Sequence, residues 1–167
     1  MGQSQLEFEA FYAAAKDDCL RTVFACIGDL HRAEDLVAEA FARAWASWGR
    51  VAHHPAPRAW IVRTALNQGV SVWRRRRREL PLADLTGWEP AVDAAQQGIE
   101  WDLNAAVLAL PPRQRQVVAL RVFLDLDTAT TARTLGIAQG TVRALLSQAM
   151  AALRTAIDTP GQRERSR

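Results

Sequence analysis

Hydrophobic side chains recur at three- and four-residue steps through most of this chain, which is the spacing of amphipathic helices. The first such helix is predicted to start just before Leu6, because Ser4 and Glu7 have the spacing of a capping box. Its helical character continues to Ile27. The amino-terminal part of the chain is therefore predicted to open with a long helix.

Gly28 and Asp29 separate this helix from the next, because glycine favours a helix end and aspartate can cap a helix start. The second helix, from about Arg32 to Trp48, has one apolar face, made of Val37, Ala40, Phe41, Ala44 and Trp48. Its opposite face is expected in solvent and carries Asp35, Glu39, Arg43 and Ala46. Taken alone, those charges are typical of an ordinary solvated surface.

A third helix is predicted from Arg58 to about Arg78, after a proline-containing break at residues 51–57. Its apolar residues occur on more than one side, so we expect it to pack against two neighbours. It ends in Trp73 and five consecutive arginines, Arg74, Arg75, Arg76, Arg77 and Arg78. The positive charges of such a run repel one another and are best stabilised by a polyanion. The alternative is solvated charge that interacts favourably with the helix dipole, but this needs only one or two cations and not five. We interpret this run as a nucleic-acid contact.

Residues 79–101 contain Pro, Gly and Asp without a sustained period, which is typical of a linker. A short helix, Leu103 to Leu110, is predicted to stop at Pro111, and Pro112 to start another helix that extends to Phe123.

The stretch from Asp125 to Leu153 has the pattern of a helix-turn-helix. Asp127 is predicted to cap a helix from Thr128 to Leu135, Gly136 to end it, and a second helix to begin near Gln139. One stripe of this second helix is predicted to be buried: Val142, Leu146, Ala149, Leu153 and Ile157. The opposite face carries Arg143, Ala144, Ser147 and Gln148. Such a pair of helices can place the second in a DNA major groove, although an ordinary helical hairpin has a similar local pattern.

Composition limits the alternatives. The chain has 167 residues, 49% of them hydrophobic, which suits one compact domain or two small ones with their own cores. The formal net charge is only +3, but residues 81–104 hold five acidic residues and no Lys or Arg. An acidic middle therefore joins two basic flanks.

Little in the chain indicates chemistry of its own. No stretch is apolar enough to span a bilayer and the start lacks a targeting pattern, so we expect a cytoplasmic protein without membrane insertion. Cys19 and Cys26 lie too far apart along one helix for a disulfide and are expected as buried free thiols. The three histidines have no metal-ligand spacing, and no Gly-rich phosphate loop occurs. We predict no catalytic residues, metal or cofactor, and no enzyme activity.

Three stretches together resemble bacterial extracytoplasmic-function sigma factors. RAEDLVAEAFARAW (32–45) is similar to region 2.2 of that family, and PRAWIVRTALNQGVSVWRRRRRE (57–79) to its helix for promoter melting and minus-10 recognition. ALPPRQRQVVALRVFLDLDTATTARTLGIAQGTVRALLSQAMAALR (109–154) is similar to region 4. Their order and spacing, over nearly the whole chain, carry the resemblance.

The resemblance implies partners and site residues. Asp35 and Glu39 fall where the family docks on the clamp helices of core RNA polymerase. The flap of the polymerase is a second surface that the resemblance implies as a contact. Trp60 and Asn67 match the family's Trp and Asn positions and are candidate DNA-binding residues. The resemblance implies that Asn67 lies near the unpaired minus-10 strand, although a buried structural asparagine is an alternative. Trp73 matches no usual family aromatic, so stacking and core packing both remain open. The candidate DNA-binding residues of the second unit are Gln139, Thr141, Arg143, Ser147 and Gln148.

Several positions depart from the family pattern. Ser71 stands where the family usually has Asp, and Thr130 and Thr131 replace its usual Glu-Ile pair. Ala138 replaces a capping serine, and Leu145 replaces a basic residue. Arg143 is thus the only cation on the recognition helix before Arg154.

The predicted fold is all-α, with two small helical domains joined by a flexible acidic linker. The predicted ranges are 4–79 for a region 2-like domain, 80–101 for the linker, 102–158 for a region 4-like helix-turn-helix domain and 159–167 for a basic tail. The predicted function is a sigma factor that binds core polymerase and promoter DNA, with an anti-sigma protein as a further partner. Two alternatives remain at this point: a free-standing helix-turn-helix regulator of duplex DNA, and a helical scaffold without a nucleic-acid role.

Overall fold

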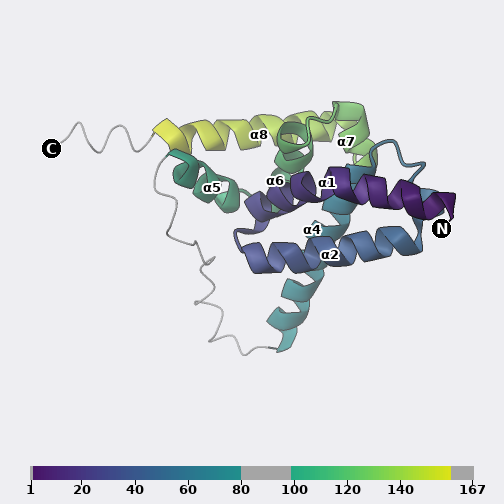
Figure 1. Ribbon diagram of the computed structural model, residues 1–167. Coiled ribbons are helices and arrows are strands. Elements are labelled where there is room, and N and C mark those ends of the chain that lie inside the picture. The colour runs from purple at the N-terminus through teal and green to yellow at the C-terminus, as the bar shows by residue number, and fades with distance from the viewer. Residues whose placement is uncertain (1, 80–98, 159–167) are drawn as a thin grey trace. The chain divides into compact units, whose positions relative to one another are not determined.

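The computed structural model describes the backbone of residues 2–79 and 99–158 and the side chains of residues 2–69 and 103–158. The chain divides into two compact units, with the division between Ala91 and Val92. Every regular element in the described ranges is helical, in agreement with the predicted all-α class (Figure 1). The predicted linker lies outside the described residues as far as residue 98.

Within residues 2–79, the described part of the first unit, there are four helices: α1 (Gln3–Ile27), α2 (Leu30–Ala46), α3 (Trp48–Val51) and α4 (Pro57–Glu79). α1 and α2 lie side by side, and α4 crosses behind them and contacts both (Figure 1). The prediction that α4 packs against two neighbours is therefore confirmed. The predicted second helix is split in the structure, because α2 ends at Ala46 and Trp48 begins the short α3.

Local signals define most boundaries in this unit. Gly28 has a φ of 79°, and its amide donates to the carbonyl of Phe24 at 2.8 Å, which ends α1. Asp29 then caps α2, because its Oδ1 accepts from the backbone N–H of Arg32 at 3.0 Å. Pro57 stands at the first position of α4, where its missing N–H costs no intrahelical bond.

The predicted capping box at Ser4 is wrong. α1 begins at Gln3, before Ser4, with Gly2 as the cap residue and no side-chain cap bond. Glu7 instead accepts a hydrogen bond from Nε2 of Gln3 at 3.2 Å. Because Ser4 is already within the first turn, its hydroxyl is not at the position from which a cap acts.

Aromatic rings fill the space between α1 and α2. The predicted apolar face of α2 is confirmed, since Val37, Ala40, Phe41, Ala44 and Trp48 are all at most 9% exposed. Six rings form a connected cluster: Phe8, Phe11, Tyr12, Phe41, Trp45 and Trp48. The rings meet mainly edge to face or tilted, which is the preferred geometry for aromatic pairs.

The second unit contains α5 (Ile99–Ala109), α6 (Pro112–Val118), the π-helical segment η2 (Ala119–Phe123), α7 (Thr128–Leu135) and α8 (Gln139–Asp158). α5 begins at Ile99, four residues before the predicted start of this helix, directly after Gly98. The predicted helix that starts at Pro112 is present, but its last turn widens into η2. Asp125 follows in the left-handed region with φ 50°, a conformation that aspartate tolerates in turns.

A small apolar core joins α5, α6 and α8. It consists of Ala106, Val107, Leu110, Val118, Ala149 and Leu153, with Met150 packed against it. Of the predicted buried stripe on α8, Val142, Ala149 and Leu153 are buried and Leu146 is half-buried. The prediction for Ile157 is wrong, because it is 46% exposed. Ile157 lies in the last turn of α8, and Leu153 is the last buried residue of that helix.

Candidate nucleic-acid interface

The helix-turn-helix is held by hydrogen bonds at both ends of α7. Oδ1 of Asp127 accepts from the backbone N–H of Thr130 at 2.7 Å, and Oδ2 accepts from the hydroxyl of Thr130 at 3.0 Å. The bond from the backbone N–H of Thr130 and that from its hydroxyl lower the pKa of the Asp127 carboxyl. Gly136 ends α7 with a φ of 66°, and its amide donates to the carbonyl of Ala132. The predicted caps of α7 are thus confirmed, and α8 follows after Gly136, from Gln139.

All five predicted DNA-binding residues of α8 are exposed: Gln139, Thr141, Arg143, Ser147 and Gln148. Nη2 of Arg143 donates to Oε1 of Gln139 at 3.5 Å, a long bond one helical turn apart. Most of the guanidinium donors of Arg143 thus remain available to an acceptor such as a base edge or a phosphate. Ala138, just before α8, is also exposed.

Gln148 is partly engaged by another helix. Nε2 of Gln114, on α6, donates to Oε1 of Gln148 at 3.3 Å. The amide oxygen of Gln148 therefore has a partner within the protein, and its amide hydrogens are directed elsewhere. Nothing in the local pattern of α8 indicates Gln114, because the two residues are 34 positions apart.

On α4, Trp60 is half-buried and Asn67 is exposed. They are seven residues apart, so they share one face of the helix. Trp73 and Arg74, Arg75, Arg76, Arg77 and Arg78 belong to α4, which continues to Glu79. Their side chains lie outside the described ones, so their predicted contacts stay predictions.

Asp35 and Glu39 are both exposed on α2, and the predicted solvent side of this helix is confirmed for Arg43 and Ala46 as well. Glu39 is also ion-paired, because Nη2 of Arg43 lies 2.7 Å from its Oε1. Gln68 of α4 contacts this pair in either amide orientation. Its Nε2 donates to Glu39 Oε1 at 3.4 Å, or, when rotated, its oxygen accepts from Arg43 Nε at 2.7 Å. The Glu39–Arg43 pair thus connects α2 to α4.

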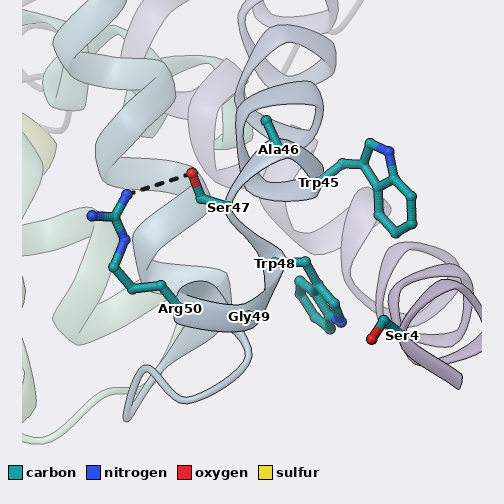
Figure 2. A pocket seen from close by; sticks show the side chains of 7 residues that line it. All are labelled: Ser4, Trp45, Ala46, Ser47, Trp48, Gly49 and Arg50. Atoms are coloured by element: carbon teal, nitrogen blue, oxygen red, sulfur yellow. Dashed lines mark hydrogen bonds between the residues drawn. The ribbon is translucent and has the colours of Figure 1, made fainter.

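An open depression lies at the end of α2, where the sequence predicted no functional site. It is lined by Ser4, Trp45, Ala46, Ser47, Trp48, Gly49 and Arg50. In Figure 2 the ring of Trp48 is directed towards Ser4 on α1, and Arg50 donates to the Ser47 hydroxyl at 3.4 Å. The indole N–H of Trp48 is buried and has no hydrogen-bond partner among the described residues.

Cys19 and Cys26 are buried thiols and do not form a disulfide, as predicted. Burial raises the pKa of the Cys19 thiol to about 12, and the nearby Arg58 only partly opposes this shift. Among the described residues, no group of three or more His, Cys, Asp or Glu side chains is placed to hold a metal ion. Within residues 2–79 and 99–158, no helix is both long and apolar enough to cross a membrane.

In comparison with known proteins, each of the two units matches a region of one protein family. Residues 11–79 match Sigma-70 region 2, and residues 101–153 match Sigma-70, region 4. The RNA polymerase sigma-E factor of Streptomyces antibioticus is 33% identical over 155 residues, which cover 92% of this chain and 86% of that protein. The ECF RNA polymerase sigma factor SigG of Mycobacterium tuberculosis is 30% identical over 178 residues, covering 89% of this chain and 48% of that protein.

A solved structure shares the fold. The sigma factor RpoE of Bartonella quintana, crystallised with the anti-sigma factor NepR, matches with a TM-score of 0.77 at 22% identity, over 91% of this chain and 97% of that chain. Because both units match sigma regions, a free-standing regulator is not favoured. The chain belongs to the extracytoplasmic-function group of the sigma-70 family and is an RNA polymerase sigma factor, which directs the core enzyme to specific promoters.

Proposed function

We propose that the two units divide promoter recognition between them. The second unit contacts the minus-35 element through α8, and the first unit binds core polymerase through α2 and opens the minus-10 element with α4. The observation that carries this proposal is the exposure of all five candidate residues on α8, a helix whose start is set by Gly136 and by the capped α7. A face that the protein core does not use is available for a groove of DNA.

On α8, Arg143 is the main candidate for direct base contact. Its guanidinium can form two parallel hydrogen bonds with O6 and N7 of guanine in the major groove. Gln139, Thr141, Ser147 and Gln148 supply further hydrogen-bonding groups on the same helix. The bond from Gln114 to Gln148 supports a role in which Gln148 donates rather than accepts.

On α4, Trp60 and Asn67 share a face that leads towards the arginine run. We propose that Asn67 hydrogen-bonds an unpaired base and that Arg74 to Arg78 attract the phosphates of the melted strand. Trp73, next to the run, supplies a ring for stacking in this proposal. The exposure of Asn67 favours this role over that of a buried structural asparagine.

On α2, Asp35 and Glu39 form the proposed docking face for core polymerase. Because Glu39 is already paired with Arg43 at 2.7 Å, docking at Glu39 requires a polymerase cation to compete with an existing ion pair. That pair is more than half exposed and is therefore weak. A partner cation that is desolvated in an interface can displace it.

Three further elements complete the proposal. The chain itself has no catalytic activity, since sigma factors are in general initiation factors that leave RNA synthesis to the core enzyme. It acts in the cytoplasm, where it meets polymerase. An anti-sigma protein is a further partner, by analogy with the Bartonella quintana protein solved with NepR.

The test reconstitutes the full chain with core polymerase and transcribes a promoter library randomised at both elements. Enrichment of two short sequence elements that depends on the chain, together with co-purification with core, is the expected result. Sequence-specific binding to duplex DNA without any affinity for core polymerase would contradict the proposal and support a free-standing regulator.

A further inference from the structure

An arginine of α2 holds α4 near the point where α4 leaves the helical bundle. Nη2 of Arg32 donates to the carbonyl oxygen of Gly69 at 3.1 Å, between residues 37 positions apart. Arg32 is itself fixed at the start of α2, because its backbone N–H donates to Asp29 at 3.0 Å. Its side chain is half-buried, so water competes only partly for this bond.

Gly69 is also close to the corner between α1 and α2. A Cβ added at Gly69 would lie 3.4 Å from Cδ1 of Leu36 and 4.0 Å from Cδ1 of Ile27. With no side chain at position 69, nothing on that residue shields its carbonyl from the guanidinium. The carbonyl of a helix has a second lone pair beyond the one used within the helix, so it can accept from Arg32 as well.

A second polar contact lies next to the first. Gln68 contacts the Glu39–Arg43 pair, and on α2 the residues Arg32, Leu36, Glu39 and Arg43 share one face, since they are spaced by four, three and four positions. That face of α2 therefore holds residues 68 and 69 of α4 by two polar contacts, and Leu36 lies between the α2 residues that make them.

Because of where these contacts lie on α4, a small change of angle there would move the end of the helix. Residues 61, 62, 65 and 66 are buried in the bundle, whereas the part of α4 after Gly69 runs on beyond α2 (Figure 1). The ten residues 70–79 extend about 15 Å, so a tilt of about 10° at Gly69 would move the end of the helix by about 3 Å. The arginine run lies on this part of the helix.

We propose that Arg32 is a positioning residue for promoter opening: its bond to the Gly69 carbonyl sets the direction in which residues 70–79 leave the bundle. The inference rests on the proposed role of α4 in opening the minus-10 element. It assigns to Arg32 no contact with DNA. The competing explanation is that Arg32, as a cation near the DNA path, binds a phosphate directly.

The geometric test measures a distance in the free, full-length chain. Spin labels are attached through Ala42→Cys, on the exposed side of α2, and Glu79→Cys, at the end of α4; the native Cys19 and Cys26 are buried. Arg32→Ala is expected to shift or broaden the distance distribution between the labels. Arg21→Ala is the matched control, because Arg21 is an arginine of the same unit that pairs with Asp18 instead. Identical distributions for wild type and Arg32→Ala would overturn the proposal.

The functional test uses holoenzyme on a promoter selected from the randomised library. Arg32→Ala is expected to bind core polymerase as wild type does but to reduce permanganate-reactive open complexes by about tenfold, the loss typical of one charge-assisted hydrogen bond. The dependence of log affinity on log salt should keep its slope. A slope flattened by about 0.7 to 0.9, with normal opening, would assign Arg32 to a phosphate contact and overturn positioning.

Two further variants separate the possible failures. Arg32→Gln keeps most of the aliphatic stem and serves as the test variant if Arg32→Ala folds poorly. The same loss of open complexes is expected for Arg32→Gln. Replacement of Arg74, Arg76 and Arg78 by Gln tests the proposed role of α4 itself. If that triple variant opens the promoter normally, the proposed function of α4 fails; if it is defective while both Arg32 variants behave as wild type, only the positioning role fails.

Discussion

Arg58 of α4 donates from Nη1 to Oδ2 of Asp18 on α1 at 2.7 Å, and so joins two helices through residues 40 positions apart. Nη2 of the same guanidinium donates to the carbonyl of Ala14 at 3.1 Å, so Arg58 contacts two successive turns of α1. Asp18 also pairs with Arg21 at 2.9 Å. The Arg58 and Asp18 side chains are 45% and 42% exposed, which leaves the pair screened by water.

The first prediction concerns this pair. A double-mutant cycle with Asp18→Asn and Arg58→Gln should give a coupling free energy of about 0.2 to 1 kcal/mol, because exposed pairs lose most of their Coulomb energy to solvent. Urea unfolding of the full chain measures it. A parallel cycle with Asp18→Asn and Arg21→Gln measures the contact within α1. A coupling free energy of zero in the Asp18–Arg58 cycle would show that the link between the helices adds nothing.

The second prediction is a pH dependence of the helix-turn-helix. The hydrogen bonds from Thr130 lower the pKa of Asp127 below its ordinary value of 3.8. The stabilising effect of this carboxylate is therefore present above pH 3.8 and is lost as the pH falls through the lower folded value. Circular dichroism of the full chain, titrated from neutral to acid, should show an unfolding component that depends on this group.

Asp127→Asn is the matched control for that titration, because the asparagine oxygen can still cap α7 but does not titrate. The acid transition of this variant should lack the Asp127 contribution. Superimposable titrations of wild type and Asp127→Asn would show that other carboxyl groups control acid unfolding.

The third prediction concerns a buried hydroxyl. Thr131 on α7 is fully buried, and its Oγ1 has no hydrogen-bond partner among the described residues. Thr131→Val keeps the shape and removes this polar group, so it should raise the free energy of unfolding by about 1 to 2 kcal/mol. Chemical denaturation measures the change.

Thr134→Val provides the control, since the Thr134 hydroxyl donates to the carbonyl of Thr130 at 2.8 Å. That substitution removes a satisfied group and should give no gain in stability. A Thr131→Val variant that is no more stable than wild type would mean that the Thr131 hydroxyl finds a partner in solution, such as a bound water.

The fourth prediction is that Arg143 carries a large share of minus-35 recognition. If it contacts guanine with two hydrogen bonds, Arg143→Ala should cost about 1 to 3 kcal/mol at one base pair and relax preference there. Transcription from the randomised library, with wild-type and variant holoenzymes at the same salt, measures this preference. A uniform drop across all sequences would indicate a phosphate contact instead, and unchanged profiles would remove Arg143 from the interface.

The fifth prediction concerns docking on polymerase. Asp35→Arg together with Glu39→Arg should weaken core binding by roughly 100-fold or more, because reversed charges in an interface cost several kcal/mol. Glu34→Arg is the control, as an exposed acid on another face of α2. Binding of the double variant to core polymerase at wild-type affinity, with a normal fold, would place the interface elsewhere.

Local sequence determined where most helices begin and end. Gly28, Asp29, Pro57, Asp127 and Gly136 act where predicted, because a cap or a helix end depends on groups within about four residues. Periodicity likewise predicted the buried face of α2 and the exposed face of α8. The wrong predictions lie at helix ends: at Ser4 the helix had already started, and at Ile157 the core had already ended.

Only the tertiary structure decided which residues meet across helices. Arg32 with Gly69, Gln114 with Gln148 and Arg58 with Asp18 join positions 34 to 40 residues apart. A hydrophobic stripe specifies which side of a helix is buried, but not how far the helix slides or turns against its neighbour. A polar contact between helices depends on both, which is why the residues that orient the candidate site were not predictable from the residues that compose it.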